Sequence, residues 1–465
     1  MRIEIPFVGQ DYANRSSNVN DQRTVNLYPR TQKMGAKSPV VLYSTPGAVL
    51  RGTAGTGPWR SDLVEFGGDL YGISGDTLYK INSSLSASSI GTLSTSGGRC
   101  VLAAGRTYLM IVDGSNGYSY DGSTFSTISD GDFPSNPSHC TYLDGFFFAN
   151  DSGSDQFYKS ASEDPTSWNA LAFASAESSP DDILAFDATY KDLYFVGSKT
   201  TEVWYNNQNP DFPFAPYPNG TMDIGIQAKY SLAKSAAGLF WLATTSEGDI
   251  SVVSNGQVIS DDIAWYLEQF TTTSDATGFS YRQNGQTKYQ ISFPTEDKTF
   301  EYIIEEQKWI ERKYNGIGRY LAAGHGYIEN QHVIVDYSNG NYYELDFSTF
   351  TDNSEEIERI RRAPVIDSNH DRLIFHELIV EFEAGVGLIT GQGSDPQAML
   401  RYSDDGGHTW SNEIWRSIGA IGQYGYRSRW TRLGISRNRI FEIKVTDPVD
   451  VTIIAAYARV TKCAN

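Results

Sequence analysis

Short apolar runs recur in pairs along most of the chain, and their regular spacing is the feature that most limits the folds open to it. Each pair is rich in aromatic and β-branched residues and is broken by Gly, Asn or Asp, which is typical of a β-hairpin. Residues 70–73 pair with 78–81 in this way, and residues 108–112 pair with 118–120. The pairs begin near residues 70, 108, 146, 193, 239, 289 and 333, at steps averaging about 44 residues. Four-stranded propeller blades take about 40 to 50 residues each, so the spacing predicts a β-propeller of six or seven blades, with a β-sandwich of accidental spacing as the alternative.

Composition supports an all-β fold. The chain of 465 residues contains 43 Gly, 29 Tyr, 23 Phe and 9 Trp. Many short strands joined by tight turns require such a mixture, because aromatic side chains suit a pleated surface and Gly suits turns.

Three segments differ in pattern. Residues 1–58 contain no repeat, and we expect an extended arm that packs on other parts of the chain or on neighbouring subunits. Residues 59–350 hold the propeller-like hairpins. A charged stretch at 351–362 fits a linker or a short helical turn, so we place a domain boundary there. Beyond it, apolar and polar residues alternate in several runs, which predicts a C-terminal β-sandwich over 351–465.

The formal net charge of the chain is −19 at pH 7. Residues 351–465 hold 14 Lys/Arg and 16 Asp/Glu, a net of −2, which leaves −17 for residues 1–350. Such a surface repels DNA phosphates, so we expect DNA to meet this protein without specific binding.

Three cysteines, Cys100, Cys140 and Cys463, lie at unrelated spacings. An odd number argues against a disulfide framework and for buried or inert thiols made in a reducing compartment. The N-terminus lacks the apolar core of a signal peptide, and no later apolar run approaches the roughly 20 residues of a membrane span. We therefore expect synthesis in the cytoplasm and no membrane insertion.

The motifs of common catalytic and metal sites are incomplete or absent in this sequence. His376 and Glu377 begin like a zinc-protease helix, but Val380 stands where the second His must be. The chain has no phosphate-binding loop and no nucleophile elbow, and its six histidines lie scattered without ligands at metal spacing. Adjacent acids such as Asp181 and Asp182 would point to opposite faces of a strand and cannot flank one glycosidic bond. We expect no catalytic residues, no metal and no cofactor, and hence no enzyme.

One turn motif stands out. The Asp-box pattern S-x-D-x-G-x-T-W, known from sialidases and other β proteins, is formed by Ser403, Asp405, Gly407, Thr409 and Trp410. In a hairpin turn the side chains of Ser403 and Asp405 can accept hydrogen bonds from backbone N–H groups, and the Trp410 ring can fold back to cover the turn. Gly407 can take a positive φ. A sialidase would repeat the box in several blades, whereas here it occurs once and outside the propeller-like region, so we expect a structural turn.

Arginine and aromatic residues gather in the last domain. The cluster comprises Tyr424, Tyr426, Arg427, Arg429, Trp430, Arg432, Arg437 and Arg439. Such a cluster can bind DNA, yet protein interfaces are enriched in the same residues. We interpret it as a candidate subunit interface, with nucleic-acid binding as the alternative.

Short runs spread over most of the chain carry a resemblance to a known family. They lie at 25–29, 45–47, 164–168, 391–397, 400–407 and 430–434. In this order they resemble the tail-hub or nozzle proteins of short-tailed bacteriophages (podoviruses), also called packaged-DNA-stabilisation proteins or tail accessory factors.

The resemblance implies a structural virion protein of the tail, made in the host bacterial cytoplasm. It implies a homohexameric ring that extends the portal-adaptor channel, retains packaged DNA together with a tail needle or plug, and conducts the DNA during ejection. It also implies side fibres or tailspikes as partners. An acidic lumen would let the duplex slide, and a head-to-tail ring needs two different complementary patches on each subunit.

Two other functions stay open. A sialidase-like or other polysaccharide depolymerase is suggested by the Asp-box, and release of sugar by the purified protein would reveal it. A receptor-binding tail module would hold host polysaccharide on exposed aromatic side chains without cleaving it, and would bind host cells.

Overall fold

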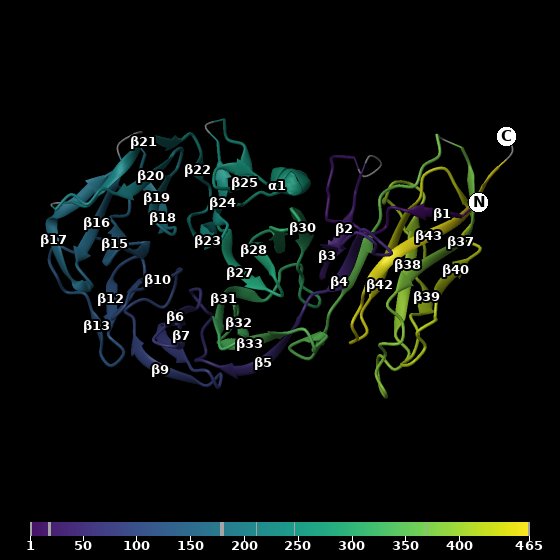
Figure 1. Cartoon of the computed structure of the whole chain (residues 1–465), viewed down its shortest axis with the longest axis horizontal. Coiled ribbons are helices and arrows are strands. Elements are labelled where there is room, and N and C mark those ends of the chain that lie inside the picture. The colour runs from purple at the N-terminus through teal and green to yellow at the C-terminus, as the bar shows by residue number, and fades with distance from the viewer. Residues whose placement is uncertain are drawn as a thin grey trace.

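The structure, a computed structural model, describes residues 2–16, 20–176, 181–210, 212–245, 247–369 and 371–463. Figure 1 shows two bodies side by side, a ring of small sheets and a two-layered body. Helix in the described residues is confined to α1 (Ala264–Gln269) and two single 3-10 turns, η1 (Lys229–Ser231) and η2 (Asp261–Ile263). The all-β prediction is therefore confirmed. No helix among these residues is both long and apolar enough to cross a membrane.

Six blades of the ring are each built from consecutive antiparallel strands. In chain order they are β6 (Val64–Phe66), β7 (Asp69–Ser74), β8 (Thr77–Ile81) and β9 (Ala87–Thr92); β10 (Val101–Ala104), β11 (Leu109–Val112), β12 (Gly117–Tyr120) and β13 (Phe125–Thr127); β14 (Cys140–Leu143), β15 (Phe146–Asn150), β16 (Gln156–Ala161) and β17 (Asp164–Ser175); β18 (Ile183–Ala188), β19 (Asp192–Gly197), β20 (Thr201–Asn206) and β21 (Phe214–Met222); β22 (Gly225–Ile226), β23 (Ala233–Ser235), β24 (Gly238–Thr244), β25 (Ile250–Ser254) and β26 (Gln257–Val258); and β27 (Thr277–Gln283), β28 (Gln286–Phe293), β29 (Lys298–Ile303) and β30 (Lys308–Glu311). The hairpin predicted first pairs Leu70 with Ile81, and its turn is closed by Gly75 at φ 59°.

The seventh blade is composite. Its inner strands are β31 (Ala322–Ile328), β32 (Gln331–Asp336) and β33 (Asn341–Asp346), and its outer strand is β5 (Gly47–Thr53) from the N-terminal segment. Leu345 pairs with Ala48 and Glu344 pairs with Val49 across this seam. Because the early strand completes the last blade, backbone hydrogen bonds between the two ends of the propeller segment close the ring.

Apolar side chains fill the spaces between adjacent blades all the way round. The innermost strands β6, β10, β14, β18, β23, β27 and β31 each contact the next, and β31 contacts β6 again. Between the third and fourth blades, for example, the rings of Phe157 and Phe195 stack with centroids 3.9 Å apart. The ring therefore has seven blades, within the range that the hairpin spacing predicts.

The second body is a β-sandwich. One sheet contains β1 (Arg2–Ile5), β3 (Leu27–Thr31), β4 (Val40–Ser44), β37 (Leu373–Phe382), β40 (Ser428–Thr431), β41 (Ile435–Ser436) and β43 (Ile453–Lys462), and the facing strands are β36 (Arg359–Arg362), β38 (Gln397–Ser403), β39 (Ile414–Ser417) and β42 (Ile440–Val445). Leu378, Trp430 and Phe441 lie fully buried between these layers. The sandwich predicted for this part of the chain is confirmed.

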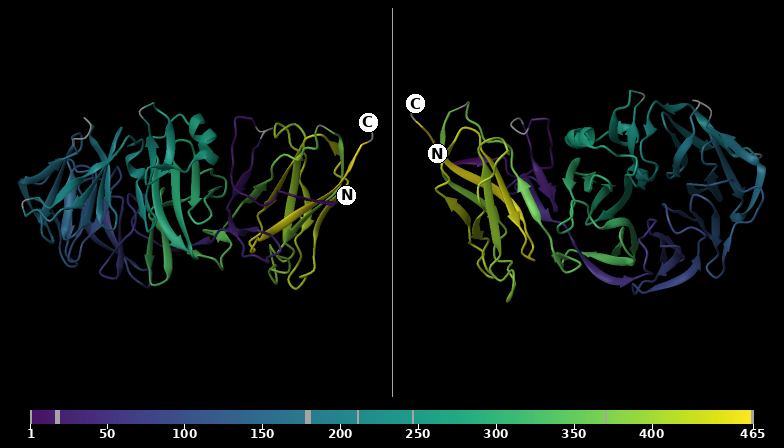
Figure 2. Two further views of the ribbon diagram at one scale, coloured as in Figure 1. Left: turned by 45° about the horizontal axis from the view of Figure 1, so that its top comes forward. Right: turned by 180° about the vertical axis from the view of Figure 1, so that it is seen from behind.

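A shared strand joins the two bodies. Strand β2 (Arg23–Val25) pairs with β30 of the sixth blade on one side and with β36 of the sandwich on the other. The N-terminal segment lies between the bodies when they are viewed from other sides (Figure 2). This segment thus contributes strands to both bodies, and a continuous sheet links them.

Residues 351–362 differ from the expected linker or helical turn. They form the short strands β34 (Thr351–Asp352), β35 (Glu355–Glu356) and β36. Arg361 is buried and donates to the carbonyl oxygens of Phe7 and Gln10 at 2.5 and 2.8 Å. Arg362 likewise pairs with Asp21, whereas Glu355 and Glu356 stay exposed. Only β36, whose buried charges meet groups far away in the sequence, becomes a central strand.

Candidate functional site

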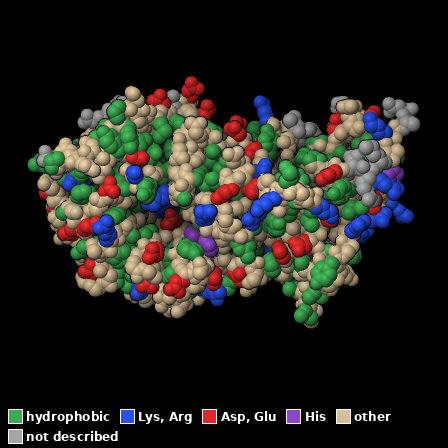
Figure 3. Space-filling view, in the orientation of Figure 1, with side chains coloured by type: hydrophobic (Ala, Val, Ile, Leu, Met, Phe, Trp, Pro, Cys, Tyr) green, Lys and Arg blue, Asp and Glu red, His purple; other side chains and the backbone are tan. Residues whose placement is uncertain are grey.

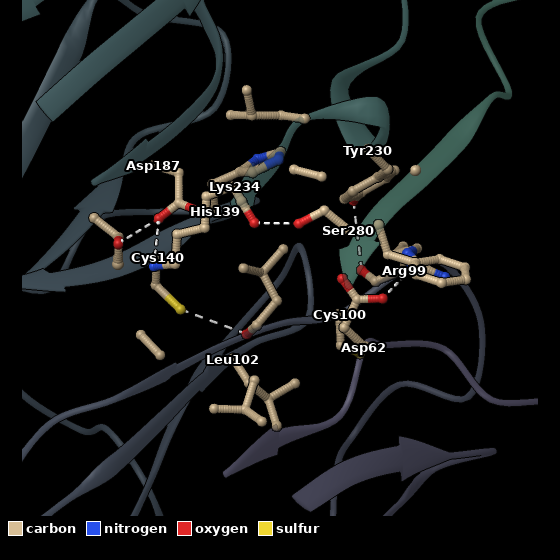
Figure 4. A pocket seen from close by; sticks show the side chains of 18 of the residues that line it. Asp62, Arg99, Cys100, Leu102, His139, Cys140, Asp187, Tyr230, Lys234 and Ser280 are labelled. Carbon is tan, nitrogen blue, oxygen red and sulfur yellow. Dashed lines mark hydrogen bonds and ion pairs between the residues drawn. The ribbon is translucent and has the colours of Figure 1, made fainter. Parts of the chain in front are cut away.

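A hollow of about 340 Å³ lies where the seven innermost strands converge. Every blade contributes to its wall, and Figure 4 shows charged and polar side chains directed into it. The residues that matter for its chemistry are Asp62, Arg99, Cys100, His139, Cys140, Asp187, Tyr230, Lys234 and Ser280.

The charges in this hollow satisfy one another. Arg99 Nη2 lies 3.2 Å from Asp62 Oδ1, and Lys234 Nζ lies 3.3 Å from Asp187 Oδ1. Thr141 Oγ1 donates to the same Asp187 oxygen at 2.7 Å. Each of these contacts joins two neighbouring blades, so together they stabilise the centre of the ring.

The titratable groups of the hollow are poorly suited to nucleophilic catalysis. Burial raises the pKa of the Cys100 thiol to about 11, and burial also raises the pKa of Cys140. A thiol reacts as its thiolate, so both groups are held in the unreactive form at neutral pH. Burial, with the charge of Lys229, lowers the pKa of His139 to about 4. His139 is therefore neutral, and its ring packs on Tyr230 with centroids 5.4 Å apart.

Metal ligands do not converge in the part of the chain that the structure covers: no group of three His, Cys, Asp or Glu there could hold an ion. His376 Nε2 lies 3.0 Å from the hydroxyl of Thr461 on the adjacent strand β43. His370, one of the six histidines, lies outside the described residues.

The Asp-box residues form a hydrogen-bonded turn between β38 and β39. Asp405 Oδ1 accepts from the hydroxyl of Ser403 at 2.7 Å and from the backbone N–H of Thr409 at 2.9 Å, while its Oδ2 accepts from the Thr409 hydroxyl at 2.6 Å. Gly407 has a φ of 94° and donates its N–H to Ser403 Oγ at 2.8 Å. Trp410 Nε1 returns to the Gly407 carbonyl at 3.0 Å. These bonds hold the pKa of Asp405 well below its usual range.

Two arginines that the sequence did not single out complete this turn. The guanidinium groups of Arg401 and Arg362 lie 4.7 and 4.9 Å from the centre of the Trp410 ring. Glu442 pairs with both arginines from the neighbouring strand β42. The Asp-box is therefore built into the sandwich wall, away from the propeller axis.

The C-terminal cluster divides into two groups. Six members are exposed on the sandwich: Tyr424, Tyr426, Arg427, Arg429, Arg432 and Arg437. The other two do not belong to this surface. Trp430 is fully buried and donates Nε1 to the carbonyl of Ile414 at 2.7 Å. Arg439 is 1% exposed, and both its Nε and its Nη2 lie 2.7 Å from the carboxylate of Asp404. Because Trp430 and Arg439 are buried, the expectation that they form part of an exposed interface is wrong.

An apolar tip adjoins the exposed group and was missed by the sequence reading. Two neighbouring loops expose Leu388, Ile389 and Ile421 beside Tyr424. The loops are linked by a hydrogen bond from Gly422 N to Gly385 O at 3.3 Å, and a side chain at Gly385 would come within 2.6 Å of the Tyr424 ring. The glycines of these loops indicate turns, but they do not show which apolar side chains the turns expose.

Family models describe both bodies of the chain. Residues 1–350 match the model described as "Bacteriophage P22 Gp10, beta-propeller", and residues 358–461 match "Bacteriophage P22 Gp10, beta-sandwich". No curated protein matches the chain significantly.

Solved structures resemble the chain only loosely. BamB from Moraxella catarrhalis shares 9% identity with a TM-score of 0.39, over 75% of this chain and 98% of BamB. The designed Ika8 protein shares 12% identity with a TM-score of 0.38, over 70% of this chain and all of Ika8. PorZ of Porphyromonas gingivalis also shares 12% identity with a TM-score of 0.38, over 81% of this chain, which spans 46% of PorZ. The two family models, by contrast, cover nearly the whole chain in order, and the chain belongs to the bacteriophage P22 Gp10 family of structural proteins of the phage virion tail.

Proposed function

We propose that the chain is a subunit of the tail hub, or nozzle, of a short-tailed phage. Six copies would form a ring that extends the portal-adaptor channel, retains the packaged DNA and conducts it during ejection. The observation that carries the proposal is the match of both bodies to one tail family in the same order.

The distribution of charge supports passage of DNA without binding. Residues 1–350, which include the whole propeller, carry a net of −17, whereas residues 351–465 carry −2. Phosphates meeting such a surface gain no release of counterions, so a duplex would slide past it.

The proposed partners of the ring are other proteins of the tail. The ring would bind the portal adaptor above it and a needle or plug that closes the channel, and would carry side fibres or tailspikes. The three cysteines are free thiols, two of them buried, which suits synthesis in the host cytoplasm.

A depolymerase is the second candidate, because the Asp-box occurs in sialidases. The box here lies in the sandwich wall, where Arg401 and Arg362 pack on Trp410 and pair with Glu442. The propeller hollow pairs each of its two cations with an acid. Neither place offers a set of unpaired arginines around a nucleophile, so we favour the structural role.

The experiment is native mass spectrometry of the purified chain, alone and mixed with portal-adaptor complexes of the same phage. Six copies joining one adaptor ring are the expected result. A chain that never joins the adaptor, or that forms trimers and releases sugar from host polysaccharide, would overturn the proposal in favour of a fibre or depolymerase.

A further inference from the structure

Two surfaces with opposite charge lie on the two bodies. We call the first the basic face; its members are Tyr424, Tyr426, Arg427, Arg429, Arg432 and Arg437. We call the second the acidic rim; its members are Asp144, Glu163, Asp164, Tyr190, Asp192 and Tyr217. Figure 1 places β40 of the basic face and β17 of the acidic rim toward opposite ends of the long axis.

The basic face concentrates positive charge in an acidic protein. Residues 414–440 contain six arginines and no acidic residue or lysine, and all of these arginines except Arg439 are exposed. Basic side chains gather at the sandwich end of the molecule in Figure 3. Tyr424 is 78% exposed and adjoins the apolar tip with Ile389, which is 84% exposed. Arginines beside exposed aromatic and aliphatic side chains are typical of protein interfaces.

The acidic rim gathers negative charge on turns of the third and fourth blades. Its four acids are Asp144, Glu163, Asp164 and Asp192. Asp144 lies in the turn between β14 and β15, and its Oδ2 accepts from Asn206 of the next blade at 2.8 Å. Glu163 of the turn between β16 and β17 donates its backbone N–H to Gly145 at 2.7 Å. The acids of these turns are thereby brought onto one side of the blades.

Exposed aromatic side chains accompany these acids. Tyr190 is 90% exposed in the turn between β18 and β19, and Tyr217 is 42% exposed with its hydroxyl 3.0 Å from Asp192. Two cations lie nearby: Arg106 is 3.7 Å from Glu163, and Lys191 lies over the Tyr190 ring. The four acids of the rim outnumber these two cations. The rim is therefore opposite in charge to the basic face, and both surfaces expose aromatic side chains.

We propose that the basic face of one copy docks on the acidic rim of a second copy. The inference rests on the proposed ring, because a head-to-tail contact requires two different complementary patches on each subunit. The charges would orient the approach, and the aromatic and aliphatic side chains would be buried at the centre of the contact.

The surroundings of the basic face favour protein over DNA as its partner. Arg429 forms an ion pair with Glu377, and Lys462 on the neighbouring strand β43 lies 2.7 Å from Asp371. These acids weaken the attraction for phosphates. The adjoining tip offers aliphatic side chains, which a protein surface can cover and a phosphate backbone cannot.

Charge reversal tests the contact in the full chain. One variant carries Arg427→Glu and Arg432→Glu, and the other carries Asp144→Lys and Asp192→Lys. Self-association is measured by sedimentation velocity over a range of protein and salt concentrations. A control with Lys33→Glu and Arg282→Glu has the same net charge as the first variant, and both control positions are exposed and belong to neither surface.

We expect wild-type association to weaken with salt, and each variant alone to associate about tenfold or more weakly than wild type and control. Mixing the two variants, or combining all four changes in one chain, should restore association, because the reversed surfaces attract each other again. Misfolding of a single variant could not produce this rescue.

Other results would overturn the inference. A wild-type chain that forms rings indifferent to these changes would refute this contact and leave the proposed ring intact. A wild-type chain that stays monomeric at every concentration would refute the contact, while the adaptor experiment would still test the hub role separately. Binding of a labelled DNA duplex that is lost in the first variant, without self-association of wild type, would assign the basic face to nucleic acid.

Discussion

Replacing Glu311 by Gln should loosen the joint between the propeller and the sandwich. Glu311 is fully buried at the end of β30, where β2 adds to the sheet. Its two oxygens accept from Arg23 Nε and Nη2 and from Lys298 Nζ, all at 2.8 Å. The cationic partners hold its pKa below the usual range against the effect of burial.

The magnitude follows from these three bonds. Each charge-assisted hydrogen bond contributes about 1.5 to 3 kcal/mol, and removing one member of a buried ion pair costs about 3 to 5 kcal/mol because the other charge stays buried. Gln keeps the volume of the side chain but removes the carboxylate that pairs directly with both cations. We expect the free energy of unfolding to fall by about 3 to 5 kcal/mol.

Urea denaturation followed by tryptophan fluorescence would measure this change, with Glu329→Gln on an exposed turn as the control. The control should stay within about 0.5 kcal/mol of wild type. Adding Arg23→Met to the Glu311→Gln chain should cost less than Arg23→Met alone, because the two residues form one network. A loss below about 1 kcal/mol, or fully additive effects, would refute the reasoning.

Three further predictions concern the same fold. Burial, and then the nearby charge of Glu311, raises the pKa of Asp11, so the folded state binds this proton more tightly than the unfolded state does. The stability of the fold should therefore fall as pH rises from about 4 through the raised pKa of Asp11. Asp11→Asn should flatten this pH dependence in thermal melts. In the Asp-box, Asp405→Ala should destabilise the turn and speed hydrogen exchange at the Thr409 amide, while Asp405→Asn should retain part of the protection; equal exchange in all three chains would contradict the bonding described. Val49→Pro should open the seventh blade, because Val49 pairs with Glu344 at the closing seam, and limited proteolysis should then cut the propeller at lower protease concentrations than in wild type.

Periodicity gave a reliable guide to the blades because each hairpin is local. The two strands of the hairpin that begins at Leu70 lie within a dozen residues, and their turn chemistry is visible in the sequence. Strand β5 was not predicted, because its partner β33 lies about 290 residues away and the run Gly47–Thr53 has little alternation. The composite blade is therefore invisible to any local pattern, and the blade number stayed at six or seven.

In the candidate interface too, local sequence could predict the exposure of some residues but not of others. Arg429 is exposed and Trp430 is buried on the same short strand, and strand alternation could have separated them. Arg439 gave no such signal, because its counter-charge Asp404 lies 35 residues earlier and reaches it only in the folded sandwich. Charge in the sequence thus located the surface, while the membership of individual residues depended on pairing at a distance.

The closing seam also sets the order of events during synthesis. Strand β5 leaves the ribosome early, but its partner β33 (Asn341–Asp346) emerges about 290 residues later, and β43 (Ile453–Lys462), which pairs with β1, emerges later still. At 5 to 20 residues per second the wait for β33 is about 15 to 60 s. Until these partners emerge, β1 and β5 lack the strands with which they pair, so a growing chain has no closed propeller. The ring therefore closes only after most of the chain has been made.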